Sequence, residues 1–505
     1  MSNQTWIFLT FIAYFAVIIG MSLYFRKSRN LSDYFLGGRR LNAWVGALSA
    51  QASDFSGWLL MGLPGAIFVA GTGRAWIAVG LFIGLTINWL CVAKRLRRYT
   101  IKANDSITLP SYLGNRFRDS TSALKTTAAV FFAIFFTVYT AAGFVAGGTL
   151  LSSIFEMDYT TALLITATFI VLYTVIGGFL AVSWTDTIQG MMMMLAIAIL
   201  PWIAINVMGG WSYVAVAVPA EHFSMFADGQ GGRISAISII SDMAWGLGYF
   251  GMPHILVRFM AIKSEPAVRR SAFIAIGWTT IALSSAVLVG IVGFAFTPGL
   301  ANSETVFIQI IDRLFMAPGA FIAAPILGGL FLCGIFAAIK STADSQLLVA
   351  SSSITGDIYN ALINKKASDR HLVWFSRISV LAVAVFAFFF ALDPDAGVMA
   401  LVANAWAGFG AAFGPLVILS LFWRRTNRVG ATAGIIVGGL TVIIWEYIPF
   451  GGEVLGASTA LYSLVPGFAL SLIAIIVGSL ATKPPSEEIL AEFEAASKPL
   501  VENKV

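Results

Sequence analysis

The chain has 505 residues, of which 58% are apolar and only 11% are charged, and its net charge is +6. Soluble domains carry about 45–50% apolar and about 25% charged residues, so soluble domains of this total length would lack the charged surface they need. A membrane-spanning helix uses about 20 mostly apolar residues. The composition therefore indicates a membrane protein with about a dozen spans, and it argues against a fused kinase or nuclease domain.

The first apolar segment, residues 5–25, is expected to remain in the protein as a membrane anchor. No basic residue precedes it, no small-residue cleavage pattern follows it, and Arg26, Lys27 and Arg29 come directly after it. A cleaved signal peptide has the opposite arrangement. Because basic residues gather in cytoplasmic loops, we expect the N-terminus outside the cell and this first loop in the cytoplasm.

Hydropathy along the chain predicts thirteen spans, which put the C-terminus in the cytoplasm. This arrangement places all but four of the 31 Lys and Arg residues (Arg74, Arg233, Arg313 and Lys340) in cytoplasmic segments, and losing or adding a span would remove that asymmetry. The spans lie near 5–25, 42–70, 75–93, 125–155, 160–180, 187–208, 235–257, 272–296, 320–350, 373–392, 397–422, 430–448 and 458–482. Residues 1–482 then form a single transmembrane domain, and the acidic tail 483–505 is expected to be a solvated helix or a disordered end.

Two of these spans contain residues that interrupt a helix. The second carries ASDFSGW at 52–58 and then Pro64-Gly65, and the seventh carries WGLGYFGMP at 245–253. Either motif alone could mark a close helix contact or a kink, but broken helices at membrane depth are tolerated only where they line a cavity or are buried. The two breaks lie five spans apart, which is typical of two inverted five-helix repeats. We place these repeats at about 42–208 and 235–422.

Five motifs carry a resemblance to a known family. SDYFLGG at 32–38, ASDFSGW at 52–58, WTDTIQ at 184–189, Ser341-Thr342 and WAGFG at 406–410 resemble the sodium:solute symporter family, and GLGYFGMPHILVR at 246–258 is similar to its proline-carrying branch. The resemblance implies an all-α membrane protein of about 13 transmembrane helices with a leucine-transporter-like 5+5 inverted repeat and broken helices 2 and 7. It also implies sodium-coupled symport of L-proline into the cell by alternating access.

A sodium ion stripped of water needs about five or six oxygen ligands, which neutral carbonyls and hydroxyls can provide. Ser341 and Thr342 offer hydroxyls, and the second-span break frees carbonyls near Ala52 and Phe55. The family resemblance implies a central sodium site made of the Ala52, Phe55 and Ala338 carbonyls and the two hydroxyls. The alternative for such a hydroxyl pair is bonding to its own helix.

A zwitterionic amino acid needs a partner for its carboxylate, a partner for its amine and an apolar wall. Residues at or beside the two breaks supply hydroxyl, close backbone and aromatic surface: Ser56, Gly57, Trp58, Tyr139, Trp245, Tyr249 and Pro253. A single aromatic residue in a membrane helix usually serves packing, but the coincidence with the breaks favours substrate contact for Trp245 and Tyr249.

Four charged residues in or at the edges of spans are candidates for coupling or structural roles. A membrane-embedded carboxylate such as Asp54 is functional by default, although it could instead hold the broken helix together. Asp186 begins the sixth span and could cap that helix or contribute to a second sodium site. Lys340 and Asp344 share a helix face with the sodium-site hydroxyls. They either form a self-neutralising pair or let protonation take over part of the coupling.

Other function classes find little support. The three histidines are widely spaced and offer no metal site or triad, and the sequence has no GxxxxGK[ST] phosphate loop, so we predict neither an enzyme nor an ATP-driven pump. A membrane sensor acting through a separate partner, or the same carrier with another small solute, remains open. We expect a plasma-membrane protein whose partners are sodium, the small-molecule substrate and lipid, without nucleic acid; the sequence predicts no oligomeric state.

Overall fold

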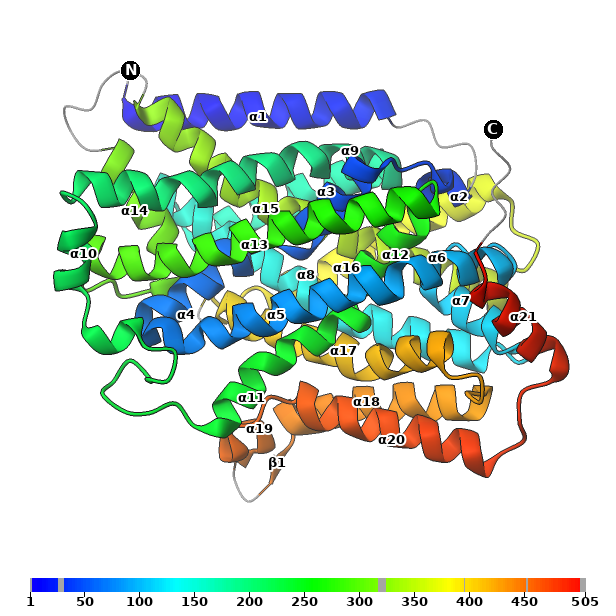
Figure 1. Ribbon diagram of the computed structural model, residues 1–505. Coiled ribbons are helices and arrows are strands. Elements are labelled where there is room, and N and C mark those ends of the chain that lie inside the picture. The colour runs from blue at the N-terminus through cyan, green and yellow to red at the C-terminus, as the bar shows by residue number, and fades with distance from the viewer. Residues whose placement is uncertain (1, 26–30, 317–323, 395, 451–452, 500–505) are drawn as a thin grey trace.

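The computed structural model describes residues 2–25, 31–316, 324–394, 396–450 and 453–499 (Figure 1). Over these residues the chain is helical apart from loops, two isolated bridges and one strand pair, β1 (Pro449–Phe450) antiparallel to β2 (Glu453–Val454). Ten helical runs in the described part are long and apolar enough to cross a membrane. The prediction of a nearly all-helical, multi-pass membrane protein is therefore confirmed.

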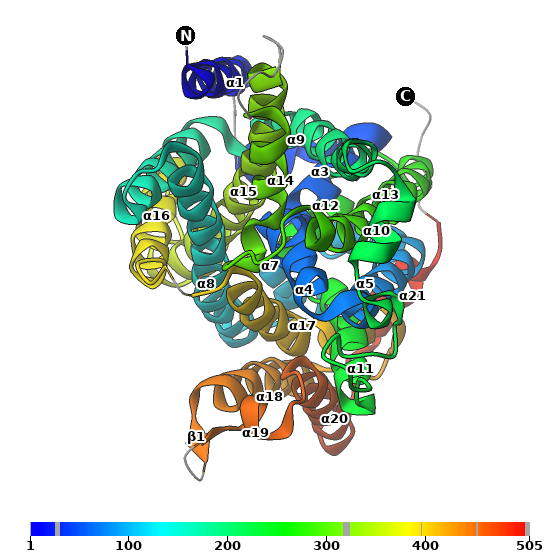
Figure 2. The same cartoon turned by 90° about the vertical axis from the view of Figure 1, so that its left-hand side faces the viewer.

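The long helices lie side by side along one direction, and Figure 2 views them end-on with α1 on one side and α18 and α20 on the other. They are α1 (Asn3–Phe25), α5 (Trp76–Ile87, which continues through a π-helical turn at Asn88–Val92 into α6, Ala93–Lys102), α8 (Ala123–Phe155), α9 (Tyr159–Val207), α13 (Glu265–Phe296), α15 (Ala324–Ser352), α16 (Asp369–Phe390), α17 (Val398–Phe422), α18 (Arg428–Tyr447) and α20 (Leu464–Ala481). Helix α15 contacts α1, α8, α9 and α16 and is buried along most of its length, so its side chains form much of the centre of the bundle.

Two further parts of the chain are divided into short helices. Helix α3 (Ala43–Asp54) is followed by a π-helical turn at Trp58–Gly62 and by α4 (Leu63–Ala70). Helix α11 (Ala236–Ala244) is followed by a 3-10 turn at Trp245–Phe250 and by α12 (Pro253–Ala261). A helix of 8–12 residues is about 12–18 Å long, far less than the roughly 30 Å of a bilayer core. None of these short helices alone is therefore long enough to cross a bilayer.

Helix α9 departs from the prediction of two spans joined at about 181–186. It runs through 49 residues without a loop and bends at Gly178, whose φ of 69° and ψ of 179° are not helical. A straight helix of this length would extend about 74 Å, more than twice the bilayer core, so a single straight span cannot contain it. The positive φ requires glycine, and the division lies at Gly178, earlier than predicted.

Shorter helices cap the two ends of the bundle, and the hydropathy did not predict them. They are α2 (Leu31–Leu36), α6 (Ala93–Lys102), α7 (Leu109–Arg116), α10 (Trp211–Ala217), α14 (Val306–Phe315) and α19 (Leu455–Thr459). Of the two forms expected for the tail, the structure shows the helix, α21 (Glu487–Ser497), which is mostly exposed and packs against α6 with Phe493 buried. Arg118 pairs with Glu488 and Glu492 at 3.0 and 2.8 Å and fixes this helix to the end of the bundle.

Candidate functional site

The first break ends α3 at Asp54, where Phe55 leaves helical geometry with φ −84° and ψ 86°. The Ser56 N–H donates to the Asp54 carbonyl at 3.1 Å, and Trp58 Nε1 donates to the same carbonyl at 3.0 Å. A Cβ on Gly57 would lie 2.8 Å from a carbon of Ala146 in α8, so the tight approach at this point favours glycine. Carbonyls in the last turn of α3 lose their usual helical partners and become available to other groups.

The second break lies in a crowded part of the bundle. A Cβ on Gly248 would lie 2.0 Å from Nε1 of Trp406, so only glycine lets the α17 indole approach the 3-10 turn. That indole donates to the Trp245 carbonyl at 2.8 Å. Pro253 then begins α12, a position where its fixed φ and missing N–H carry no cost. The 3-10 turn therefore packs against α17, and Pro253 begins the helix that follows it.

Four of the five predicted sodium-site residues meet where the first break crosses α15. The Ser341 hydroxyl lies 2.6 Å from the Ala52 carbonyl oxygen and 3.2 Å from that of Ala338, and the Thr342 hydroxyl donates to Ala52 at 3.3 Å. Phe55, the fifth predicted residue, is buried at the end of α3. Among the described residues, its carbonyl makes none of these contacts. The Ser341 and Thr342 hydroxyls therefore bond to α3. The alternative that they bond only to their own helix is wrong.

Tyr249 joins the two breaks through Asp54. The Tyr249 hydroxyl donates to one Asp54 carboxylate oxygen at 2.7 Å, and the other oxygen has no hydrogen-bond partner among the described residues. Trp245 lies with its ring 6.4 Å from that of Trp58 and 6.3 Å from that of Trp406. Indole rings from both breaks and from α17 therefore pack against one another, and Tyr249 links the second break to the Asp54 carboxylate.

The remaining predicted substrate contacts also come from these elements. All seven of the predicted residues are buried. The Tyr139 hydroxyl on α8 has no hydrogen-bond partner within the described residues, while the Ser56 hydroxyl accepts from the Trp58 N–H at 3.4 Å. A buried phenol without a partner can donate to or accept from a bound polar ligand.

Asp186 does not cap a helix. It lies inside α9, eight residues beyond the bend at Gly178, and Arg258 Nη2 lies 3.2 Å from its Oδ2. The same oxygen accepts from Ser49 at 2.8 Å, and Arg258 also donates to Ser345 at 2.5 Å. Arg258 is buried in α12, so it lies within a helix of the bundle and not in the loop to which the sequence assigned it. This network joins α3, α9, α12 and α15.

Lys340 and Asp344 form a buried ion pair with Nζ and Oδ2 2.6 Å apart. The ammonium also lies 3.4 Å from the Gln189 side-chain oxygen and over the Tyr173 ring, and Thr174 donates to Asp344 at 2.7 Å. These contacts turn the ammonium toward α9, whereas the neighbouring Ser341 hydroxyl points to α3. The structure therefore shows the self-neutralising pair, which was one of the two alternatives from the sequence.

Comparison with known proteins identifies the family. The model of the sodium:solute symporter family matches residues 34–438. The chain belongs to the sodium:solute symporter family. Similar proteins include the high-affinity proline transporter of Bacillus subtilis, which is 46% identical over 94% of this chain and 98% of that protein. The sodium/proline symporter of Escherichia coli is 44% identical over 98% of this chain and 97% of that protein.

Two solved transporters share the fold of this family member. A sodium-coupled sialic acid symporter in a substrate-bound, outward-open state has a TM-score of 0.78 and 20% identity, covering 95% of this chain and 99% of that one. A nucleobase-cation-symport-1 family transporter has a TM-score of 0.57 and 14% identity, covering 93% of this chain and 100% of that one. At these identities the likeness concerns the fold alone.

Sequence reasoning missed two residues of the site in this symporter. Trp406 was part of a quoted motif but was not assigned a role, and it fills the space beside Trp245 and Tyr249. Arg258 was counted as a loop cation, although it follows only five residues after Pro253, where a restarted helix is still within the bundle. Its spacing from the break was the signal that could have identified it.

Proposed function

We propose that the protein is a secondary active transporter that couples sodium entry to the uptake of L-proline by alternating access. The observation that carries this proposal is the Ala52 carbonyl, which joins the first helix break to the hydroxyls of Ser341 and Thr342. Relatives that are 46% and 44% identical over nearly their whole length are named as proline carriers, which supports the substrate. The E. coli relative is named as sodium-coupled, which supports the ion.

We assign the sodium site to the Ala52, Phe55 and Ala338 carbonyls and the Ser341 and Thr342 hydroxyls. A bound sodium ion would draw these oxygens toward itself and replace the direct hydroxyl-to-carbonyl bonds. The ion would then fasten the end of α3 to the middle of α15. One turn further along both helices, Ser49 and Ser345 contact the Asp186–Arg258 pair, so tightening at the ion site is transmitted to α12, the second half of the other broken crossing.

Asp54 provides the charge that compensates the ion in this proposal. The five predicted ligands are neutral, while Asp186 and Arg258 neutralise each other, as do Lys340 and Asp344. Asp54 has only the neutral Tyr249 hydroxyl as a side-chain partner among the described residues. Because an uncompensated charge at membrane depth is costly, a sodium ion and the Asp54 carboxylate each stabilise the other.

Proline would occupy the space between the two breaks. Trp58, Trp245 and Tyr249 offer apolar and aromatic surface for the pyrrolidine ring, and the unpaired Tyr139 hydroxyl offers a donor for the substrate carboxylate. Ser56 and Gly57 supply a hydroxyl and a close backbone, and Pro253 shapes the other wall. We assign these seven residues, with Trp406 added as support behind the Trp245 and Tyr249 rings.

We further propose thirteen spans in residues 1–482, with inverted repeats at about 42–208 and 235–422, the N-terminus outside and the 483–505 tail in the cytoplasm. Access from outside is through a cavity of about 480 Å³ that reaches Trp245 and is also lined by Arg74, Asp242 and Tyr462. Arg74 and Asp242 form an ion pair at 3.0 Å across it. The fold of the two solved symporters supports this arrangement.

The substrate is tested by a competition panel. Purified protein in liposomes takes up labelled L-proline under an inward sodium gradient, and we expect unlabelled L-proline to compete at concentrations at which other amino acids, organic acids and sugars do not. A different solute that competes and accumulates better would replace proline as the substrate. A protein that binds proline but accumulates nothing would favour the membrane sensor.

A further inference from the structure

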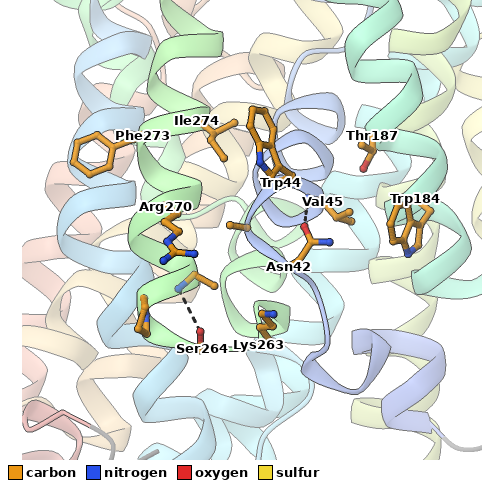
Figure 3. A pocket seen from close by; sticks show the side chains of 13 residues that line it. Asn42, Trp44, Val45, Trp184, Thr187, Lys263, Ser264, Arg270, Phe273 and Ile274 are labelled. Carbon is orange, nitrogen blue, oxygen red and sulfur yellow. Dashed lines mark hydrogen bonds between the residues drawn. The ribbon is translucent and has the colours of Figure 1, made fainter. Parts of the chain in front are cut away.

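A cavity of about 730 Å³ lies on the outside of the bundle, away from the helix breaks. It is bordered by the first turn of α3, the middle of α9 and the first turns of α13 (Figure 3). Three large rings line it and remain open to the surroundings: Trp44 is 64% exposed, Phe273 63% and Trp184 38%. Exposed aromatic rings near the ends of membrane helices are typical of the lipid–water interface.

Two cations share this cavity with the aromatic rings. Lys263 and Arg270 line it, and within the described residues neither side chain has an ion pair or a hydrogen bond. The nearest acid in the chain, Glu265, is held by Arg98 at 2.5 Å and Lys94 at 3.3 Å. The cavity therefore carries positive charge that the described residues around it leave uncompensated.

Two helices begin at the cavity and add to its preference for anions. Asn42 accepts the Val45 N–H at the start of α3, and Ser264 accepts the Ala267 N–H at the start of α13. The N-terminal turn of each helix carries partial positive charge. Both helix starts therefore act in the same direction as the two cations.

We propose that this cavity binds an anionic phospholipid, whose phosphate lies between Lys263 and Arg270 and whose acyl chains pass Trp44 and Phe273. A lipid accounts for both halves of the cavity, because a soluble anion would use the cations and leave the exposed rings without a role. Since the cavity joins the start of α3 to α13, the bound lipid fastens these two helices together. The proposal does not depend on which solute the protein transports.

The test compares dioleoylphosphatidylglycerol with dioleoylphosphatidylcholine in retention by the detergent-solubilised full-length protein, measured by native mass spectrometry. Wild type should retain the anionic lipid more strongly. A cation near an anionic lipid surface contributes about fivefold in affinity, so K263Q/R270Q should lower phosphatidylglycerol affinity by about tenfold or more. The matched control K365Q/K366Q removes two exposed basic residues that do not line the cavity and should retain wild-type affinity.

Two further variants separate headgroup from chain contacts. W44A/F273A should weaken retention of both lipids, while K263R/R270K should keep the preference for phosphatidylglycerol. The melting temperature of each lipid-free variant checks that it is folded. Equal phosphatidylglycerol affinity in K263Q/R270Q and K365Q/K366Q would overturn the proposal, as would glycerol phosphate stabilising the protein as well as the intact lipid does.

Discussion

Replacing Ser341 with alanine is expected to weaken sodium binding without changing the proline site itself. The Ser341 hydroxyl is the closest side-chain contact to the Ala52 carbonyl, at 2.6 Å, and it also lies 3.2 Å from the Ala338 carbonyl. It therefore stands between two other proposed sodium ligands. The substitution removes one oxygen from a set of five and leaves the helix otherwise intact, because alanine is a good helix former.

A polar contact to a charged group contributes about 1.5–3 kcal/mol, which corresponds to a loss of about ten- to a hundredfold in sodium affinity. The lower end is expected, because the hydroxyl also stabilises the sodium-free state through Ala52. By linkage, a weaker sodium site lowers apparent proline affinity at low sodium, and raising the sodium concentration should restore it.

The assay is the sodium dependence of labelled proline binding and uptake in proteoliposomes. Ser352→Ala is a matched control, because Ser352 is also buried in α15 and, among the described residues, its hydroxyl bonds only to the Val349 carbonyl of its own helix, at 2.7 Å. We expect the half-saturating sodium concentration to rise for Ser341→Ala and to stay near wild type for Ser352→Ala. Equal half-saturating concentrations in the two variants would refute the assignment of the sodium site.

Five other substitutions test separate parts of the account. Asp54→Ala should abolish sodium-driven proline accumulation while the protein still inserts into the membrane; normal uptake at low sodium would show that this carboxylate is dispensable. Trp245→Ala and Tyr249→Ala should each weaken equilibrium proline binding by about 1–3 kcal/mol, and unchanged affinity in both would move the substrate away from the second break. Lys340→Met should keep sodium dependence and lower the melting temperature, because Asp344 loses its partner; a switch to proton dependence would contradict this. Arg258→Met should cost about 3–5 kcal/mol in unfolding free energy, and an unaltered denaturation midpoint would argue against the network.

Helix type and the positions of the breaks were predictable because their signals are local. Gly57 marks a place where the backbone approaches a neighbouring helix, and Pro253 marks the start of a new helix. Both residues, and the polar residues beside Gly57, can be read directly from the sequence. The division of α9 was less predictable. Gly178 and its neighbour Gly177 look like ordinary small residues of a membrane helix, and only the positive φ of Gly178 identifies the bend.

The partners of buried charges were harder to predict, because they depend on contacts between distant segments. Asp186 follows a break in hydropathy and so resembled a helix cap, but its partner Arg258 is 72 positions away. Lys340 and Asp344 are different, since a separation of four residues already places them on one helix face and the structure pairs them. Spacing along one helix was informative, whereas pairing between helices required the fold.

The most direct test of the central claim measures labelled L-proline accumulation in proteoliposomes under a sodium gradient alone and under a proton gradient alone. The account predicts accumulation above equilibrium with the inward sodium gradient at equal pH on both sides, and none with the proton gradient when sodium is absent. Accumulation driven by the proton gradient alone, with no response to sodium, would contradict the assignment of the coupling ion to the Ala52, Ser341 and Thr342 oxygens.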